Sequence, residues 1–491
     1  MRSNIFKTLK TAVLAVSVLL LGASVSFAQV SVGLTAAPTS AILPDGNTVP
    51  MWGYSCAAGS ANCAALNASP LGGWSPVVIT VPTGQSLTIN LTNSLPVPTS
   101  LTIVGQADTG LGTSAAMAGV TPHNDSSVTW PIAGSTGFNP PPQGSRVRSF
   151  STEVGATSSG SVQWAGLRPG TYLLESGTHP SIQGPMGLYG IVVVTATPAS
   201  GVAGTAYPGI TYNSELPLLF SEIDPIQNAA VALAIAQPGF SESSVWSGQP
   251  GGCGTLAIPN CYPPAVNYKP LYYLINGRAF DRTHASASLY ASSAVTGVAA
   301  GTPGSVLVRL VNAGLRMHVP SIVGSVSTPA VRPSNAGAPT AAPGFSLVAE
   351  DGNPLPGVSR VQSEVFMAAG KTYDVMIDVP AAGGTALPIF DRELSLSSNS
   401  VGRDGGMLAY IGVNGALAPA ADASAAMVAD HSSRHRSGAF EAPSRTWKVP
   451  CVLGQDVPAE ATGLGHRDRA QVGRAAQDGR ENRRRGRSGL F

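Results

Sequence analysis

The side chains with the most chemical potential in this sequence are a few acids and histidines, and their spacing forms no complete site. Glu175 and His179 lie four residues apart, and a carboxylate with an imidazole suits zinc or iron. Glu222 and Asp224 lie two apart, where paired carboxylates could perform acid–base work. No partner base accompanies this pair, so we interpret it as a solvated turn ahead of Pro225.

The other histidines are isolated in the sequence. His123 lies in a Pro-His-Asn turn, His284 in a Ser/Ala-rich stretch, and His318 shortly after an Asn-Ala-Gly turn. A metal site needs several convergent ligands, so we interpret each as a hydrogen-bonded core or surface residue. The chain also contains no GxSxG, Walker, HExxH or CxxCH motif. The sequence therefore predicts no catalytic, cofactor-binding or metal-ligating residues.

The elements that would position these side chains are strands. Of 491 residues only 11% are charged, and the 57 glycines and 40 prolines favour many turns. Runs such as VVITV and LTINL, both within residues 77–91, alternate with period two as half-buried strands do. The length allows two or three domains, so we expect an all-β protein built of sandwiches.

Two stretches of the N-terminal half resemble the first domain of multicopper oxidases. They are GGWSPVVITVPTGQSLTINLTNSLPVPTSLTIVGQ (72–106) and GTYLLESGTHPSIQGPMGLYG (170–190). The family places copper-binding histidines in an H-W-H-G and an H-S-H motif. By this resemblance the four ligand positions fall on Thr102, Val104, Glu175 and Gly177, and His179 lies two residues beyond the last. Copper prefers imidazoles and thiolates, so the resemblance predicts a fold without its copper ligands.

Four landmarks in order resemble the second domain of the same family, which carries no copper in three-domain members. They are YLINGRAFDRT (273–283), GSVLVRLVNAGLRMHVPSIVGS (304–325), FSLVAEDGNPLPGV (345–358) and AAGKTYDVMIDVPAAGG (368–384). The resemblance implies tandem cupredoxin-like antiparallel β-sandwiches of Greek-key topology. We expect the first domain over residues 29–200 and the second over 201–415.

The family activity would be copper-dependent oxidation of a metal ion or small organic reductant, coupled to dioxygen reduction. Electron removal and storage require a type 1 site and a trinuclear cluster, and neither ligand set is present. We therefore expect no copper in this chain and no activity by itself. The alternative is a non-enzymatic cupredoxin scaffold or binding protein at the cell surface. Substrate and oligomeric state are not readable from the sequence.

The N-terminus has the three regions of an export signal. Arg2, Lys7 and Lys10 precede an apolar run over 12–21, followed by a small-x-small cleavage site. We expect a signal peptide over residues 1–28 and a periplasmic or secreted protein. The apolar run is too short for a permanent membrane span, which needs ~20 residues.

The cysteines agree with an oxidising compartment. Cys56 and Cys63 flank one short loop, and Cys253 and Cys261 flank another. Two local disulfides are the economical pairing. Cys451 is left over.

The composition changes after the linker that begins at residue 416. Residues 431–491 contain eleven arginines, one lysine and six acids, a net charge of +6. A disordered nucleic-acid-binding arm is one interpretation, although nucleic acid is an improbable partner outside the cell. A shifted reading frame that replaces a third, copper-bearing domain is the interpretation that we favour. We expect residues 416–491 to be a linker and a disordered tail.

Overall fold

A computed structural model describes residues 29–107, 122–123, 146–147, 149–198, 202–238, 268–291, 304–329, 340–379, 386–397, 405–413 and 415–417. All of them belong to one unit of the chain, which extends to Ser432. The expected signal peptide, the Cys253–Cys261 pair, Cys451 and the arginine-rich tail lie outside the described residues.

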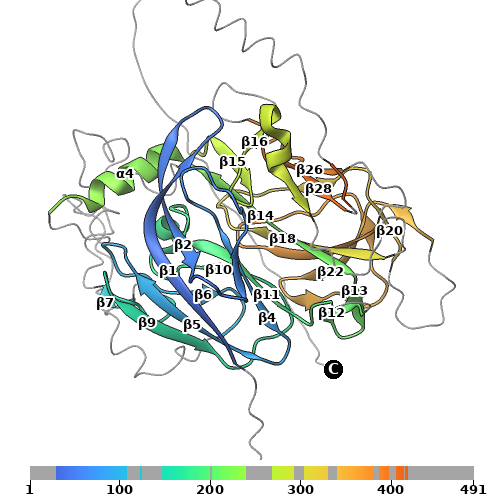
Figure 1. The fold of residues 1–491 in the computed structure, drawn as a ribbon, viewed down its shortest axis with the longest axis horizontal. Helices are drawn as coiled ribbons and strands as arrows, with labels where there is room; N and C mark the ends of the chain where they lie inside the picture. Colours follow the sequence, from blue (N-terminus) through green and yellow to red (C-terminus); the bar gives the residue numbers. More distant parts are fainter. Residues whose placement is uncertain are drawn as a thin grey trace, which may run out of the picture. The chain divides into compact units, whose positions relative to one another are not determined.

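The first sandwich has an outer sheet with apolar and polar side chains in alternation. Buried and more exposed residues alternate along the first half of β1, as expected of a strand with one face on a core. A long hairpin joins β1 to β2 (Figure 1, blue). In sheet order the strands are β2 (Thr48–Cys56), β1 (Gln29–Ile42), β5 (Ser86–Asn93) and β9 (Ser159–Trp164).

The second sheet of this sandwich has a central strand, β11 (Tyr189–Thr195), that is buried on both faces. Every residue of β11, with sequence YGIVVVT, is buried, because one face packs on the outer sheet and the other on the second sandwich. In sheet order its strands are β3 (Cys63–Ala65), β4 (Val77–Pro82), β11 (Tyr189–Thr195), β10 (Gly170–Glu175) and β6 (Thr102–Ile103).

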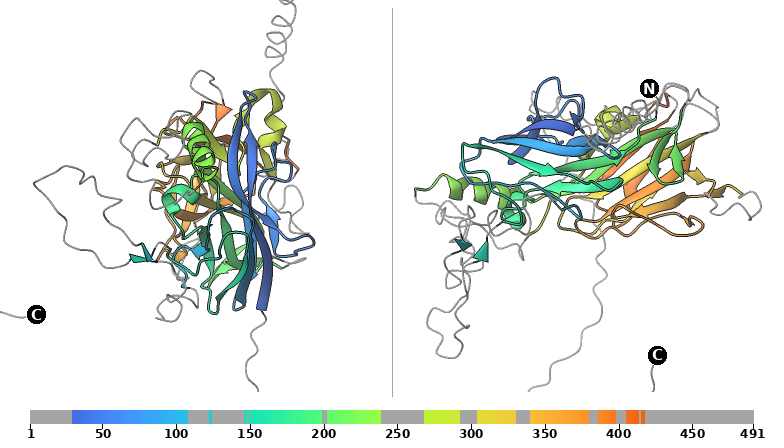
Figure 2. Two further views of the ribbon diagram at one scale, coloured as in Figure 1. Left: turned by 90° about the vertical axis from the view of Figure 1, so that its left-hand side faces the viewer. Right: turned by 90° about the horizontal axis from the view of Figure 1, so that it is seen from below.

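The second sandwich repeats this plan with a larger inner sheet (Figure 2). That sheet comprises β15 (Tyr272–Ile275), β14 (Ser214–Ile223), β18 (Ser305–Asn312), β25 (Thr372–Asp378), β22 (Phe345–Glu350) and β23 (Asn353–Pro354), with β24 (Val361–Gln362) also on β22. The facing sheet comprises β17 (Leu289–Ala291), β28 (Leu408–Gly412), β26 (Leu387–Asp391) and β19 (Pro320–Ile322). A separate apolar core fills the space between them.

Short elements complete the described chain. The two-stranded pairs are β12 (Gly204–Tyr207) with β13 (Ile210–Tyr212), β16 (Phe280–Asp281) with β27 (Gly405–Gly406), β20 (Val326–Ser327) with β21 (Ala342–Pro343), and β7 (Pro122–His123) with β8 (Arg146–Val147). The helices are α3 (Pro180–Gln183), α4 (Pro225–Ile235) and the 3-10 helix η3 (Arg282–Ser288). No helix among the described residues is both long enough and apolar enough to cross a membrane.

The two inner sheets share a third apolar core. Leu173 and Val193 of the first sandwich lie in one cluster with Leu219, Leu274 and Val311 of the second. Burial of apolar surface stabilises by about 25 cal/mol per Å², so this interface contributes to folding as an ordinary core does. The domain boundary near residue 200 stays a prediction.

The predicted fold class of tandem cupredoxin-like β-sandwiches is confirmed, with one correction to its detail. Four pairs of the described strands are parallel: β1 with β5, β4 with β11, β14 with β18, and β17 with β28. The reason is the path of the chain. After the β1–β2 hairpin the chain crosses to β3 and β4 of the other sheet and then returns to β5 beside β1 in the same direction.

A disulfide joins Cys56 at the end of β2 to Cys63 at the start of β3, as the sequence predicts. The bond therefore ties the two sheets of the first sandwich together where the chain crosses between them. Closing so short a loop stabilises by about 2.5 kcal/mol on the chain-entropy model.

Candidate functional site

Three of the four positions that align with the family's first-domain copper ligands lie together. β6 pairs with β10 and places Thr102 opposite Glu175. A Cβ atom added to Gly177 would overlap Thr102 Oγ1 and lie 3.1 Å from Ser100 Oγ. Val104 is an exposed residue just beyond β6. The family resemblance therefore identifies positions that are neighbours in the folded chain. The space beside Gly177 is filled by the hydroxyl groups of Thr102 and Ser100.

Ser100 belongs to a larger buried network of hydroxyl groups, whereas Thr102 Oγ1 is buried without a hydrogen-bond partner among the described residues. Thr178 Oγ1 lies 3.1 Å from each of Ser100 Oγ, Ser149 Oγ and Glu153 Oε1, and the two serine hydroxyls are 2.8 Å apart. A second group centres on an amide. Gln183 Oε1 accepts hydrogen bonds from Thr99 Oγ1 (2.8 Å) and Ser176 Oγ (2.6 Å), and Gln183 Nε2 donates to Pro98 O (2.8 Å). We call these residues the hydroxyl cluster: Thr99, Ser100, Ser149, Glu153, Ser176, Thr178 and Gln183.

The residues at the aligned positions do not fit a copper centre of the family's kind. Thr102, Val104 and Gly177 supply no imidazole or thiolate, and an imidazole on Gly177 would collide with Thr102. Burial raises the pKa of Glu175 to about 7, so this carboxyl group is partly protonated at neutral pH. The hydroxyl cluster satisfies its own members by hydrogen bonding, as buried polar groups require.

His179 stabilises the turn that follows these positions. Its backbone is left-handed, with φ 40° and ψ 59°, and it directly precedes α3. Its carbonyl oxygen accepts hydrogen bonds from Ile182 N (2.8 Å) and Gln183 N (2.9 Å). In the part of the chain that the structure describes, neither His179 nor Glu175 joins a group of three or more metal-ligand side chains. Glu175 is the last residue of β10, as expected of a residue at a strand end.

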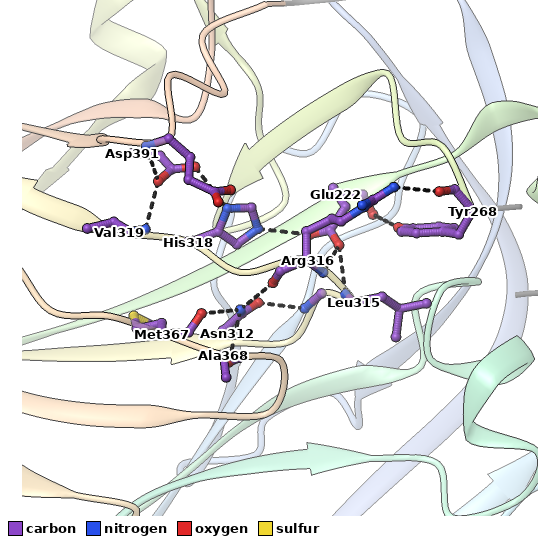
Figure 3. A network of polar contacts seen from close by, with 12 residues as sticks. Glu222, Tyr268, Asn312, Leu315, Arg316, His318, Val319, Met367, Ala368 and Asp391 are labelled. Carbon is purple, nitrogen blue, oxygen red and sulfur yellow. Dashed lines mark hydrogen bonds and ion pairs between the residues drawn. The ribbon is translucent and has the colours of Figure 1, made fainter. Parts of the chain in front are cut away.

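His318 forms the most highly charged contact of the second sandwich. Its ring lies between two acids (Figure 3), with Nδ1 2.9 Å from Asp391 Oδ2 and Nε2 3.0 Å from Glu222 Oε2. All three side chains have no exposed surface. Burial alone would lower the pKa of His318, but the hydrogen bonds to Asp391 and Glu222 outweigh it and raise the pKa to about 9. At neutral pH the ring is therefore an imidazolium.

Backbone groups hold the two acids in place. Glu222 Oε1 accepts from Leu315 N and Arg316 N, both at 2.7 Å, and Asp391 Oδ1 accepts from Val319 N at 2.7 Å. Burial would raise the pKa of Asp391, but hydrogen bonds from His318 and Val319 lower it. Asn312 Nδ2 bonds the neighbouring carbonyls of Arg316, Met367 and Ala368, also drawn in Figure 3.

The interpretation of Glu222 and Asp224 as a solvated turn is wrong. Glu222 lies within β14 and is buried against His318. Asp224 is the N-cap of α4, where its Oδ1 accepts from Ile226 N and Gln227 N. The partner of Glu222 is distant in the sequence, whereas those of Asp224 are the first backbone amides of the helix that it caps.

The same region contains the one group of three close metal-ligand side chains among the described residues. Ligand atoms of His318, Asp391 and Glu393 lie within 4.8 Å of one another. Both ring nitrogens of His318 already face carboxylates, and an imidazolium has no lone pair for a metal. At neutral pH this arrangement is an ion-pair bridge between strands.

Arg309 forms a second charged contact, which sequence reasoning missed. Glu215 Oε2 lies 2.8 Å from both Nε and Nη2, and Nη1 donates to Thr171 Oγ1 at 2.8 Å. Asp374 accepts from Thr171 and Tyr207 and lies 3.5 Å from Nη1. Thr171 belongs to the first sandwich and Arg309 to the second. The sequence does contain a signal for this contact, because a charged residue, Arg309, interrupts the otherwise apolar strand SVLVRLVN.

His284 plays no part in these networks. It lies at a kink within η3, where its backbone is non-helical, and its side chain is 75% exposed. His123 lies in β7, whose partner strand is β8.

Comparison with known proteins finds similarity only at the level of solved structures. No protein-family model and no curated protein matches the sequence. The blue copper oxidase from Nitrosomonas europaea is 14% identical with a TM-score of 0.45, and the match covers 78% of this chain and 85% of that chain. The multicopper oxidase mgLAC is 16% identical with a TM-score of 0.48, and the match covers 81% and 89%.

A copper nitrite reductase from Nitrosomonas europaea is 14% identical with a TM-score of 0.43, and the match covers 80% of this chain and 97% of that chain. At these identities the likeness concerns the fold, and no ligand or activity transfers from these proteins. Each of these matches covers most of this chain, and two of the three solved structures are a blue copper oxidase and a multicopper oxidase.

Proposed function

We propose that this chain is a multicopper-oxidase-like scaffold without first-domain copper, which does not oxidise substrates by itself and acts as a binding protein outside the cytoplasm. The observation that carries the proposal is the packing beside Gly177, where the hydroxyl of Thr102 occupies the space that a ligand side chain would need. Loss of imidazoles alone could leave an open cleft for another metal. A hydrogen-bonded hydroxyl cluster instead makes this region part of the folded core.

Export is the second part of the proposal. The described part of β1, Gln29–Ile42, lies wholly after the expected cleavage site. The disulfide between Cys56 and Cys63 also suits an oxidising compartment.

The test is copper loading of the full chain under air, followed by gel filtration and elemental analysis. We expect less than one tightly held copper ion per chain and no dioxygen consumption with Fe²⁺ or a phenol as reductant. A His284→Gln variant is the matched control, because this exposed histidine could hold copper loosely at the surface. Stoichiometric copper that persists in the variant, or the intense blue colour of a thiolate–copper site, would refute the proposal.

A further inference from the structure

We propose that a cavity at the junction of the two sandwiches binds a small organic anion with an apolar body. The cavity has a volume of about 270 Å³, close to the lower end of the ~300–1,000 Å³ usual for ligand pockets. Its polar side chains are those of Asn67, Arg278, Asp281, His284 and Ser288. This inference rests on the proposed function, because it names the class of ligand that the binding scaffold would hold.

Most of the cavity lining is apolar and comes from well-defined backbone. Leu43 and Leu71 of the first sandwich line the cavity together with Leu274 and Ala279 of the second. The first two are held by backbone hydrogen bonds, Leu43 N to Asn47 O (2.9 Å) and Ile42 N to Leu71 O (3.2 Å). A ligand would therefore meet a preformed apolar surface and would order few side chains on binding.

Arg278 supplies the positive charge of this site. Its Nη2 donates to Ser69 O at 2.8 Å and approaches Asn67 Oδ1 at 3.4 Å, so one edge of the guanidinium is anchored to the first sandwich. Its Nε is buried and has no hydrogen-bond partner among the described residues. A buried N–H without an acceptor costs about 1–3 kcal/mol, and an oxygen of a bound anion would satisfy it.

Ser288 supplies a second hydrogen-bond donor. The residue is 1% exposed, and its hydroxyl has no partner within the part of the chain that the structure describes. Two groups that line one cavity, Arg278 Nε and Ser288 Oγ, thus both lack an acceptor. Buried polar groups in native proteins are nearly always hydrogen-bonded, so this coincidence indicates a missing polar ligand.

Asp281, the acid in the cavity lining, has its own hydrogen-bond partners, so its oxygens do not compete for the donors of Arg278 and Ser288. Asp281 Oδ1 accepts from Thr283 N (2.9 Å) and Thr283 Oγ1 (2.6 Å), and Oδ2 lies 2.8 Å from His284 Nδ1. Burial would raise the pKa of Asp281, but these hydrogen bonds from Thr283 and His284 lower it. The donors left over are those of Arg278 and Ser288, and they select an oxyanion such as a carboxylate.

The test is isothermal titration calorimetry of the full chain with benzoate, which joins a carboxylate to an apolar ring. Benzyl alcohol is the neutral comparison, and we expect it to bind at least ~10-fold more weakly because it cannot make the charge-assisted hydrogen bond. Arg278→Gln should weaken benzoate binding at least ~10-fold, and Ser288→Ala about 3-fold to 10-fold. Arg392→Gln removes a comparable surface charge away from the cavity and should leave the affinity unchanged.

A further variant protects the test against misfolding at Arg278. Leu71 is 59% exposed, so Leu71→Ser should fold normally yet weaken benzoate binding about 3-fold or more, whereas Ile226→Ser, on exposed α4 surface, should not. The inference is overturned if benzoate does not bind at millimolar concentration. It is also overturned if benzyl alcohol binds as tightly as benzoate, or if the Arg278→Gln variant binds benzoate as tightly as the unmutated chain. A copper-loaded protein that still binds benzoate would refute the proposed function and keep this site. A copper-free protein that does not bind benzoate would refute this site and leave the proposed function standing.

Discussion

At the scale of single residues, the dominant feature is a buried imidazolium held between two carboxylates. Glu222, His318 and Asp391 come from three different segments, and their charges are compensated only within the folded chain. Such a bridge is costly to desolvate, and its stability depends on the proton that makes His318 a cation. The protein should therefore respond to pH at a value where ordinary histidines have already lost their charge.

We predict that folding stability falls as the pH rises from about 7 to 10. The pKa of His318 is about 9 in the folded chain against 6.5 when unperturbed. Its contribution is therefore complete below pH 6.5 and is lost as the pH rises through 9, by an amount on the order of 3 kcal/mol. Urea unfolding at a series of pH values measures this slope.

Two variants show whether His318 causes the slope. His318→Gln should destabilise the protein at neutral pH and remove most of the decline above pH 7. His284→Gln, which changes an exposed histidine, should keep the decline. A decline that is equal in all three proteins contradicts the assignment to His318.

The sequence could not show this bridge, for a physical reason. Glu222 lies 96 residues before His318, and Asp391 lies 73 residues after it, so neither acid shares a local motif with the ring. Spacing arguments detect ligands on one helix or one turn. They fail for side chains that meet only after the two sheets of the second sandwich have packed together.

At the scale of strands, the Arg309 contact couples both sandwiches. Arg309 of β18 and Asp374 of β25 are directly paired in the antiparallel register, and Thr171 of β10 reaches both. Glu215 of the same sandwich and the hydroxyl of Thr171 from the other sandwich complete the hydrogen bonds of this charged pair. The buried charge of Arg309 therefore specifies how β18 and β25 pack against β10 of the other sandwich.

We predict strong coupling between Arg309 and Asp374. Arg309→Met should cost about 3–5 kcal/mol, because it leaves buried carboxylates unpaired. In an Asp374→Asn background the same substitution should cost at least about 1 kcal/mol less, since one of those charges is already gone. Arg392→Met, which breaks an exposed ion pair, should cost less than about 1 kcal/mol. Additive costs for Arg309→Met and Asp374→Asn in urea unfolding would contradict the prediction.

Strand existence was readable from the sequence, whereas strand direction was not. Period-two runs such as residues 77–81 and 87–91 became β4 and β5. The parallel pairing of β1 with β5 depends on a crossover between sheets, which leaves no local pattern. The fully apolar run of β11 did signal a strand covered on both faces.

At the scale of the described unit, the third apolar core and the Arg309 contact join the two sandwiches. We predict a single cooperative unfolding transition by calorimetry, with equal calorimetric and van't Hoff enthalpies. Leu219→Ala, in the shared core, should lower the midpoint without splitting the transition. Two separate transitions in the unmutated chain would show that the sandwiches fold independently.

Burial of the inner strands on both faces has a consequence for how this protein can change its sequence. An outer strand such as β1 has alternate positions open to solvent, and these can accept almost any polar residue. β11 has no such position, because every one of its side chains is enclosed. Sequence drift should therefore accumulate in the outer layers and the turns, while the two central sheets retain their apolar character and change only by swaps that conserve volume.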